Sequence, residues 1–93
     1  MSISLDDITA ARNRIDKYIR RTPLAQSPWL SEMTGGRILL KVESLQTTGS
    51  FKLRGAVNAL ASLLERSEAV APSVVTASAG NHGRAMAWAA ERL

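Results

Sequence analysis

Lys52 is the residue of this sequence whose position most clearly predicts chemistry. It follows the Gly/Ser loop 48–50 and lies at the start of a helix that we expect over residues 51–66. The start of a helix carries partial positive charge and backbone N–H groups without intrahelical partners. An anion or a neutral, nucleophilic amine is favoured there, and partial burial beside Phe51 would favour the neutral amine further. Lys52 therefore predicts imine chemistry on a phosphate-bearing cofactor, although position alone also allows a lysine that extends from a first turn into solvent.

A second loop of small and polar residues precedes another expected helix. Its residues are Ser78, Ala79, Gly80, Asn81 and His82. Small side chains let a ligand approach the backbone closely, and the N–H groups of a helix start can bind a carboxylate. Asn81 can hydrogen-bond a ring hydroxyl of a ligand, or it can serve as a simple N-cap. His82 has no second histidine in the chain, so we expect no metal site.

The overall composition is typical of a soluble globular protein. Hydrophobic residues make up 45% and charged residues 22% of the 93-residue chain, which has no cysteine and therefore no disulfide or thiolate metal site. The formal net charge is +4, but the arginines are scattered and only 4% of residues are aromatic, which disfavours a nucleic-acid surface. A small basic nucleic-acid-binding protein is the weakest alternative. No basic leader or apolar span is recognisable, so we expect a cytoplasmic location and no membrane partner.

Apolar spacing and turn signals predict helices connected through two short strands. The expected elements are a helix over 5–19 with a capping box at its start, a short helix over 28–33, a strand over 38–42, the helix over 51–66, a strand over 74–77 and a helix that begins near residue 81. Two strands joined by a crossover helix make a parallel βαβ unit, so the expected fold class is α/β. Both chemistry-bearing loops follow a strand and precede a helix, which places them at the same edge of the sheet.

Two motifs in the chain resemble those of a known enzyme family. They are Lys41–Ala56, which reads K-V-E-S-L-Q-T-T-G-S-F-K-L-R-G-A, and Thr76–Gly83, which reads T-A-S-A-G-N-H-G. The turn at Arg21–Leu24 is a weaker third match. Together they resemble the pyridoxal-phosphate enzymes of fold type II, with a fold like that of the tryptophan synthase β chain. Within these enzymes the chain is most similar to the serine/threonine dehydratase branch of threonine ammonia-lyases and serine racemases.

This resemblance implies roles for the candidate residues. Lys52 would hold the aldehyde of pyridoxal 5'-phosphate, Asn81 would hydrogen-bond the phenolic oxygen of that cofactor, and the loop 78–82 would bind the carboxylate of an amino-acid substrate. The implied reaction is the dehydration and deamination of a hydroxy amino acid such as L-threonine or L-serine to a 2-oxo acid and ammonia. A substrate derived from hydroxyectoine would suit the same motifs, because residues outside them read the substrate side chain.

Two single-residue departures from the family pattern refine the implied function. Ala79 stands where serine racemases have a second serine that transfers a proton, which favours dehydration over racemisation. Thr47 stands where animal racemases have a lysine of a nucleotide-binding patch, so the resemblance implies no nucleotide site here.

The length of the chain is a further departure. The family's glycine-rich phosphate loop is not found before Leu93. We therefore expect residues 1–93 to be the N-terminal portion of a lyase domain, with weak cofactor binding and little activity alone, completed by a homo-oligomer or by a missing C-terminal part. The alternative is a catalytically inactive remnant or interaction module of the same fold.

Overall fold

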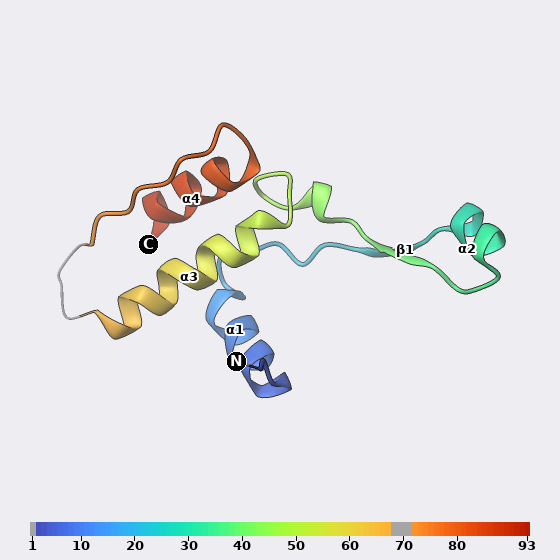
Figure 1. Cartoon of the computed structure of the whole chain (residues 1–93), viewed down its shortest axis with the longest axis horizontal. Coiled ribbons are helices and arrows are strands. Elements are labelled where there is room, and N and C mark those ends of the chain that lie inside the picture. The colour runs from blue at the N-terminus through green and yellow to red at the C-terminus, as the bar shows by residue number, and fades with distance from the viewer. Residues whose placement is uncertain (1, 68–71) are drawn as a thin grey trace.

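Helices form the body of the molecule, and a slender arm extends from it (Figure 1). The computed structural model describes residues 2–67 and 72–93. In the body, α3 (Lys52–Arg66) packs along α4 (Asn81–Arg92), and α1 (Leu5–Ile15) crosses α3. α3 and α4 run in the same direction, so the two helices begin at the same end of the body (Figure 1).

The core lies where α3 meets its neighbours. Leu53 and Val57 on α3 are fully buried and share one apolar cluster with Ala85 and Ala89 of α4. The alanine side chains are small, so the two helix backbones can lie close together. The cluster also contains Ile15, Ala56 and Leu60, with Tyr18, Ile19, Met86, Trp88 and Leu93 packed against it.

α1 begins where the sequence predicts and ends earlier. The capping box is confirmed: Ser4 Oγ accepts from the Asp7 backbone N–H at 3.1 Å, and Asp7 Oδ2 accepts from the Ser4 N–H at 2.8 Å. The helix ends at Ile15 rather than at residue 19. The Tyr18 N–H bonds the Ile15 carbonyl at 2.8 Å, a tighter turn that brings Tyr18 and Ile19 against the core.

One arginine fastens α1 to α3. The Arg14 guanidinium pairs with Glu65 at 3.0 Å and donates to Asn58 Oδ1 at 2.8 Å. The ion pair is partly exposed, so its role is to orient α1 more than to stabilise the fold.

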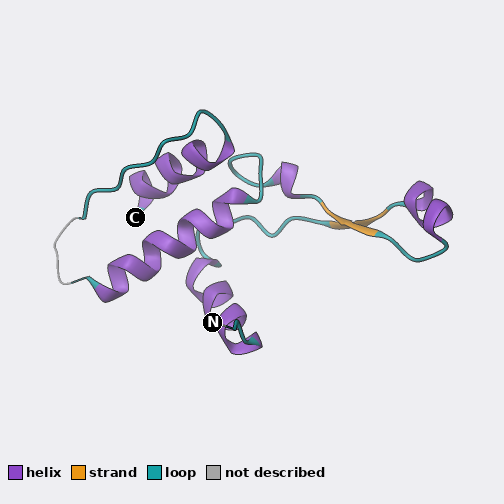
Figure 2. Ribbon diagram, viewed as in Figure 1, coloured by secondary structure: helices purple, strands orange, loops and turns teal. Residues whose placement is uncertain are grey.

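The arm is an antiparallel strand pair that encloses a short helix (Figure 2). β1 (Leu24–Gln26) pairs with β2 (Leu39–Lys41), with Leu24 opposite Lys41. Between the strands, α2 (Pro28–Thr34) begins at the predicted cap, Ser27, and ends at Gly35, whose φ of 71° suits glycine. A 3-10 turn, η1 (Glu43–Leu45), then leads from the arm toward α3.

The predicted parallel βαβ unit does not form within the described residues. The strand expected over 38–42 is present as β2, but its partner is β1, which the sequence analysis did not predict. Residues 74–77, expected as the second strand, form no strand, and Val75 is 97% exposed. A parallel strand needs a hydrogen-bonded neighbour and cover on both faces, and the described part of the chain places neither beside residues 74–77. The helices on either side of this segment, α3 and α4, are as predicted.

Truncation of the α3 core should unfold the body. We expect Leu53→Ala to lower the free energy of unfolding by about 2–5 kcal/mol, because it removes a fully buried side chain and leaves a cavity. Leu64→Ala, at a 37% exposed position of the same helix, should cost less than about 1 kcal/mol. Urea titration followed by far-ultraviolet circular dichroism measures both. Equal losses in the two variants would contradict this assignment of the core.

Candidate functional site

Lys52 is the first residue of α3, as expected, but its amine is exposed. Phe51, the N-cap residue, makes no side-chain capping bond and is itself 63% exposed. The Lys52 Nζ lies 5.4 Å from the centroid of the Phe51 ring. The partial burial that would favour a neutral amine is therefore not observed. The amine is instead open to a ligand that approaches the start of the helix.

Gln46 fixes the loop that precedes Lys52. Its side chain is almost fully buried, and it bonds both backbone groups of Arg20: Oε1 accepts from the Arg20 N–H and Nε2 donates to the Arg20 carbonyl, each at 2.8 Å. Gln46 Oε1 also accepts from the Thr47 N–H at 3.1 Å. The loop then turns at Gly49, whose φ of 81° is readily adopted only by glycine. The backbone ahead of Lys52 is thus tied to the segment that follows α1.

A second set of polar contacts joins Glu43 to α3. The Glu43 carboxylate forms an ion pair with the Arg54 guanidinium, which makes a second contact at 3.2 Å, and it accepts a hydrogen bond from the Thr22 hydroxyl. Lys41 Nζ donates to the Thr22 carbonyl at 2.6 Å. The hydrogen bond from Arg54 is the main reason that the pKa of Glu43 lies below its ordinary value, and the Thr22 hydroxyl and the charges of Arg54 and Lys41 act in the same direction.

The anchoring roles of these residues were not predicted from the sequence. Arg54 lies in the first turn of α3, two residues after Lys52, so its ion pair with Glu43 constrains the turn that carries the amine. Glu43 and Gln46 lie in the motif that carries the resemblance. The signal that could have found them is their polar side chains in the connection between a strand and a helix, because a polar side chain that such a connection buries must be hydrogen-bonded.

Two buried hydroxyls beside the loop have no hydrogen-bond partner among the described residues. They belong to Thr48 and Ser50, on either side of Gly49. A buried hydroxyl without a partner costs about 1–3 kcal/mol. Both oxygens are sealed from solvent, so a polar ligand at the start of α3 can bond them only if the loop shifts to expose them.

The second predicted loop is exposed and folds tightly onto the start of α4. Gly80 is the N-cap, so the alternative role of Asn81 as a simple cap is not observed. Because Gly80 has no side chain, no capping group competes for the first N–H groups of α4. The Gly80 N–H bonds Ser78 Oγ at 3.2 Å, and a Cβ added to Gly83 would lie 2.7 Å from the Ser78 carbonyl oxygen.

The fold brings the two predicted loops to one end of the body. Leu53, in the first turn of α3, and Ala85, at the start of the second turn of α4, are both fully buried in the same cluster, so the two helix starts lie at the same end (Figure 1). Both helices lack a side-chain cap. An exposed amine and two sets of N–H donors therefore share this end, an arrangement suited to an anionic ligand that carries a carbonyl carbon.

The described part of the chain holds neither a metal-binding cluster nor a membrane-spanning helix. No group of three or more His, Cys, Asp or Glu side chains there could hold a metal ion. Within residues 2–67 and 72–93, no helix has the length and apolar character needed to cross a membrane.

Comparison with known proteins gives consistent matches. The profile of the family described as "Pyridoxal-phosphate dependent enzyme" matches residues 15–93. An L-threonine ammonia-lyase of Thermotoga maritima is 52% identical over 89 residues, covering 96% of this chain and 22% of the relative. A serine racemase of Dictyostelium discoideum is 46% identical over 90 residues, covering 97% of this chain and 27% of the relative. The crystal structure of a pyridoxal 5'-phosphate-dependent aspartate racemase matches with a TM-score of 0.86 at 46% identity, over 99% of this chain and 29% of that one. The chain spans about a quarter of the length of these proteins.

Acid should weaken the Glu43 anchor. Because the folded protein holds the pKa of Glu43 below its ordinary value of 4.5, the contribution of this carboxylate to stability is fully present above about pH 4.5 and is lost as the pH falls through the folded pKa. We expect Glu43→Gln to cost about 1–3 kcal/mol at neutral pH and to flatten the fall in stability below pH 4.5. Urea unfolding at several pH values measures this. Glu32→Gln, at an exposed position of α2, is the control and should leave the profile unchanged.

Gly83 should be intolerant of a side chain. In Gly83→Ala the new Cβ meets the Ser78 carbonyl, so we expect a loss of about 1–3 kcal/mol and displaced amide signals for residues 78–82 in NMR spectra. Gly55→Ala is the matched control, because a Cβ at that position of α3 meets nothing within 4 Å and alanine favours a helix by about 0.5–1 kcal/mol. Unchanged signals in Gly83→Ala would show that the loop is not held against α4.

Proposed function

Because the chain belongs to the family of pyridoxal-phosphate-dependent enzymes, we propose that it supplies the reactive lysine of an enzyme that dehydrates and deaminates a hydroxy amino acid. The substrate class is L-threonine or L-serine, and the products are a 2-oxo acid and ammonia. The observation that carries the proposal is the placement of Lys52 at the uncapped start of α3, at the same end of the body as the uncapped start of α4.

The residues at this end fit the cofactor of the family. The Lys52 amine would bond the aldehyde carbon and the Asn81 amide would hydrogen-bond the phenolic oxygen. The unpartnered hydroxyls of Thr48 and Ser50 would bond the other polar groups once the loop shifts to expose them. When bound, pyridoxal 5'-phosphate supplies an electron sink for the negative charge that develops at the substrate α-carbon.

The remaining roles belong to the chain itself. The first N–H groups of α4, within the loop 78–82, would hold the substrate carboxylate, which the positive end of the helix favours. With a substrate bound, the neutral Lys52 Nζ would be the base that takes the α-proton. The hydrogen bonds of Gln46 and the ion pair of Glu43 would hold the start of α3 in place. The Lys52 amine could then serve both as the group that binds the cofactor and as the base.

Ala79 favours elimination over racemisation. The similar proteins include both an ammonia-lyase and racemases, so likeness alone does not separate the two reactions. Racemisation requires a second proton-transferring group on the opposite face of the substrate, and a methyl side chain cannot transfer a proton. Elimination needs only the base that removes the α-proton and a leaving β-hydroxyl.

A second candidate is an inactive module of the same fold. It is favoured by the exposure of Lys52 and of the loop 78–82, since water screens both the amine and the carboxylate-binding N–H groups in this arrangement. Selective reaction of the amine with the cofactor separates the two candidates.

Lys52 should react with the cofactor in preference to the other lysines. We expect the 93-residue chain, treated with pyridoxal 5'-phosphate and then with borohydride, to carry the pyridoxyl group mainly on Lys52, with several-fold less on Lys17 and Lys41, as measured by peptide mass mapping. Lys52→Arg should remove most of the label, whereas Lys17→Arg, the control, should not. Occupancy should be low and ammonia release from L-threonine negligible.

Two outcomes would contradict the proposal. Equal labelling of the three lysines would remove the special role of Lys52 and favour the inactive module. Stoichiometric labelling with rapid ammonia release would disprove the expected weak cofactor binding and low activity of this length of chain.

A further inference from the structure

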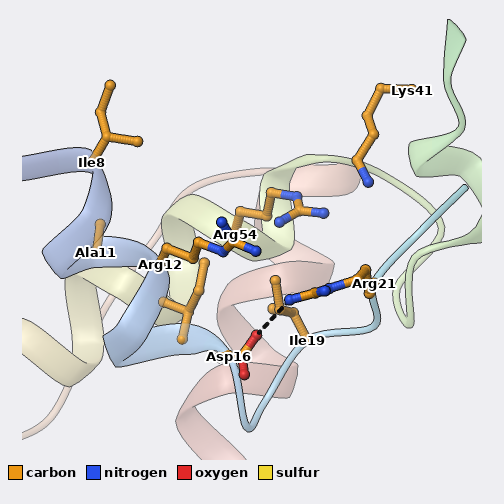
Figure 3. A pocket seen from close by; sticks show the side chains of 9 residues that line it. Ile8, Ala11, Arg12, Asp16, Ile19, Arg21, Lys41 and Arg54 are labelled. Carbon is orange, nitrogen blue, oxygen red and sulfur yellow. Dashed lines mark ion pairs between the residues drawn. The ribbon is translucent and has the colours of Figure 1, made fainter. Parts of the chain in front are cut away.

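A cavity of about 710 Å³ lies on the side of the body where α1 faces α3 and β2 (Figure 3). Its apolar wall comes from α1 and the turn after it. Its lining residues are Ile8, Ala11, Arg12, Ile15, Asp16, Ile19, Arg21, Lys41 and Arg54. Neither Lys52 nor any residue of the loop 78–82 contributes, so the cavity is separate from the candidate site.

Positive charge dominates the lining of the cavity. Arg12, Arg21, Lys41 and Arg54 all contribute, and Figure 3 shows their nitrogen atoms directed toward the space between the elements. Asp16 is the only carboxylate among the lining residues.

Much of this charge lacks a strong partner within the described residues. Arg54 is neutralised by Glu43, which contacts it from outside the lining set. The Arg12 side chain makes no ion pair or hydrogen bond among the described residues. Arg21 approaches Asp16 only at 4.0 Å, with both side chains mostly exposed, and such pairs contribute little. Lys41 donates to an uncharged carbonyl.

We propose that this cavity binds a small organic dianion: a compact apolar body that carries a phosphate monoester or two carboxylates. The isoleucine and alanine side chains would cover the apolar body, and the Arg12 and Arg21 guanidinium groups, which can reorient because they are exposed, would clamp the anionic end. The volume lies within the range of small-molecule sites. Arg54 lies both in this cavity and two residues from Lys52, so a ligand here would contact the turn that carries the amine.

Binding can be measured on the full 93-residue chain by NMR titration at low ionic strength. The probes are phenyl phosphate, phthalate and inorganic phosphate. We expect phenyl phosphate and phthalate to shift the methyl signals of Ile8, Ala11 and Ile19, and inorganic phosphate to bind more weakly because it has no apolar body. The stronger of the two organic probes identifies the anionic group that the cavity prefers.

Substitutions of Arg12 and Arg21, the two lining arginines that lack a strong ion pair, test whether their charges hold the ligand. The double variant R12Q/R21Q should weaken phenyl phosphate binding by about tenfold or more, because it removes two charge-assisted contacts. R37Q, which alters an exposed arginine outside the lining, is the control and should bind like the unaltered chain. Circular dichroism checks that each variant keeps its helices, as expected for substitutions at exposed positions.

Three results would overturn the proposal. They are the absence of saturable shifts at the cavity methyl groups, equal affinity for inorganic phosphate and the organic probes, and equal weakening by R37Q and by R12Q/R21Q. The second would show that the apolar wall contributes nothing to binding, and the third that only the general positive charge of the chain attracts the probes. None of these results depends on whether Lys52 reacts with the cofactor, so the two proposals succeed or fail separately.

Discussion

The packing of α3 along α4 is the constraint on which the rest of the structure depends. Leu53 and Val57 lose all contact with solvent there because Ala85 and Ala89 offer a surface small enough for close approach. Since the helices run in the same direction, this contact also fixes where their first turns lie. The loop before Lys52 and the loop 78–82 are distant in the sequence, and the buried face of α3 is what brings both to one end.

The polar contacts around the first loop add a second layer of order. Gln46 uses both ends of its amide on one residue of the segment after α1, and Glu43 holds Arg54 in the first turn of α3. The backbone at Lys52 is therefore fixed on two sides while the amine itself stays exposed. That combination suits a nucleophile, because the attachment point must stay still while the reactive atom reaches an external carbonyl.

Positive potential is a property shared by the two sites that we propose. At the helix starts it comes from backbone N–H groups and one amine, and in the cavity between α1 and α3 it comes from guanidinium groups. Both settings favour anions, and Arg54 belongs to the cavity while its ion pair orders the loop before Lys52. The pyridoxal-phosphate family, to which the chain belongs, uses a cofactor with a phosphate and an aldehyde, and we propose the first site for it. The second site depends only on the charges and shape described above.

The sequence by itself determined the helices α1 to α4, the caps at which α1 and α2 begin, and the position of Lys52 at the start of α3, because periodicity and capping depend on residues within a turn of each other. Only the tertiary structure decided the pairing of β1 with β2, the absence of a strand over 74–77 and the partners of Glu43 and Gln46. Each of these depends on residues more than ten positions apart, and a β-branched run such as 74–77 becomes a strand only where a neighbour offers hydrogen bonds. Local chemistry thus decided which residues begin each helix, and long-range contacts decided which of them meet.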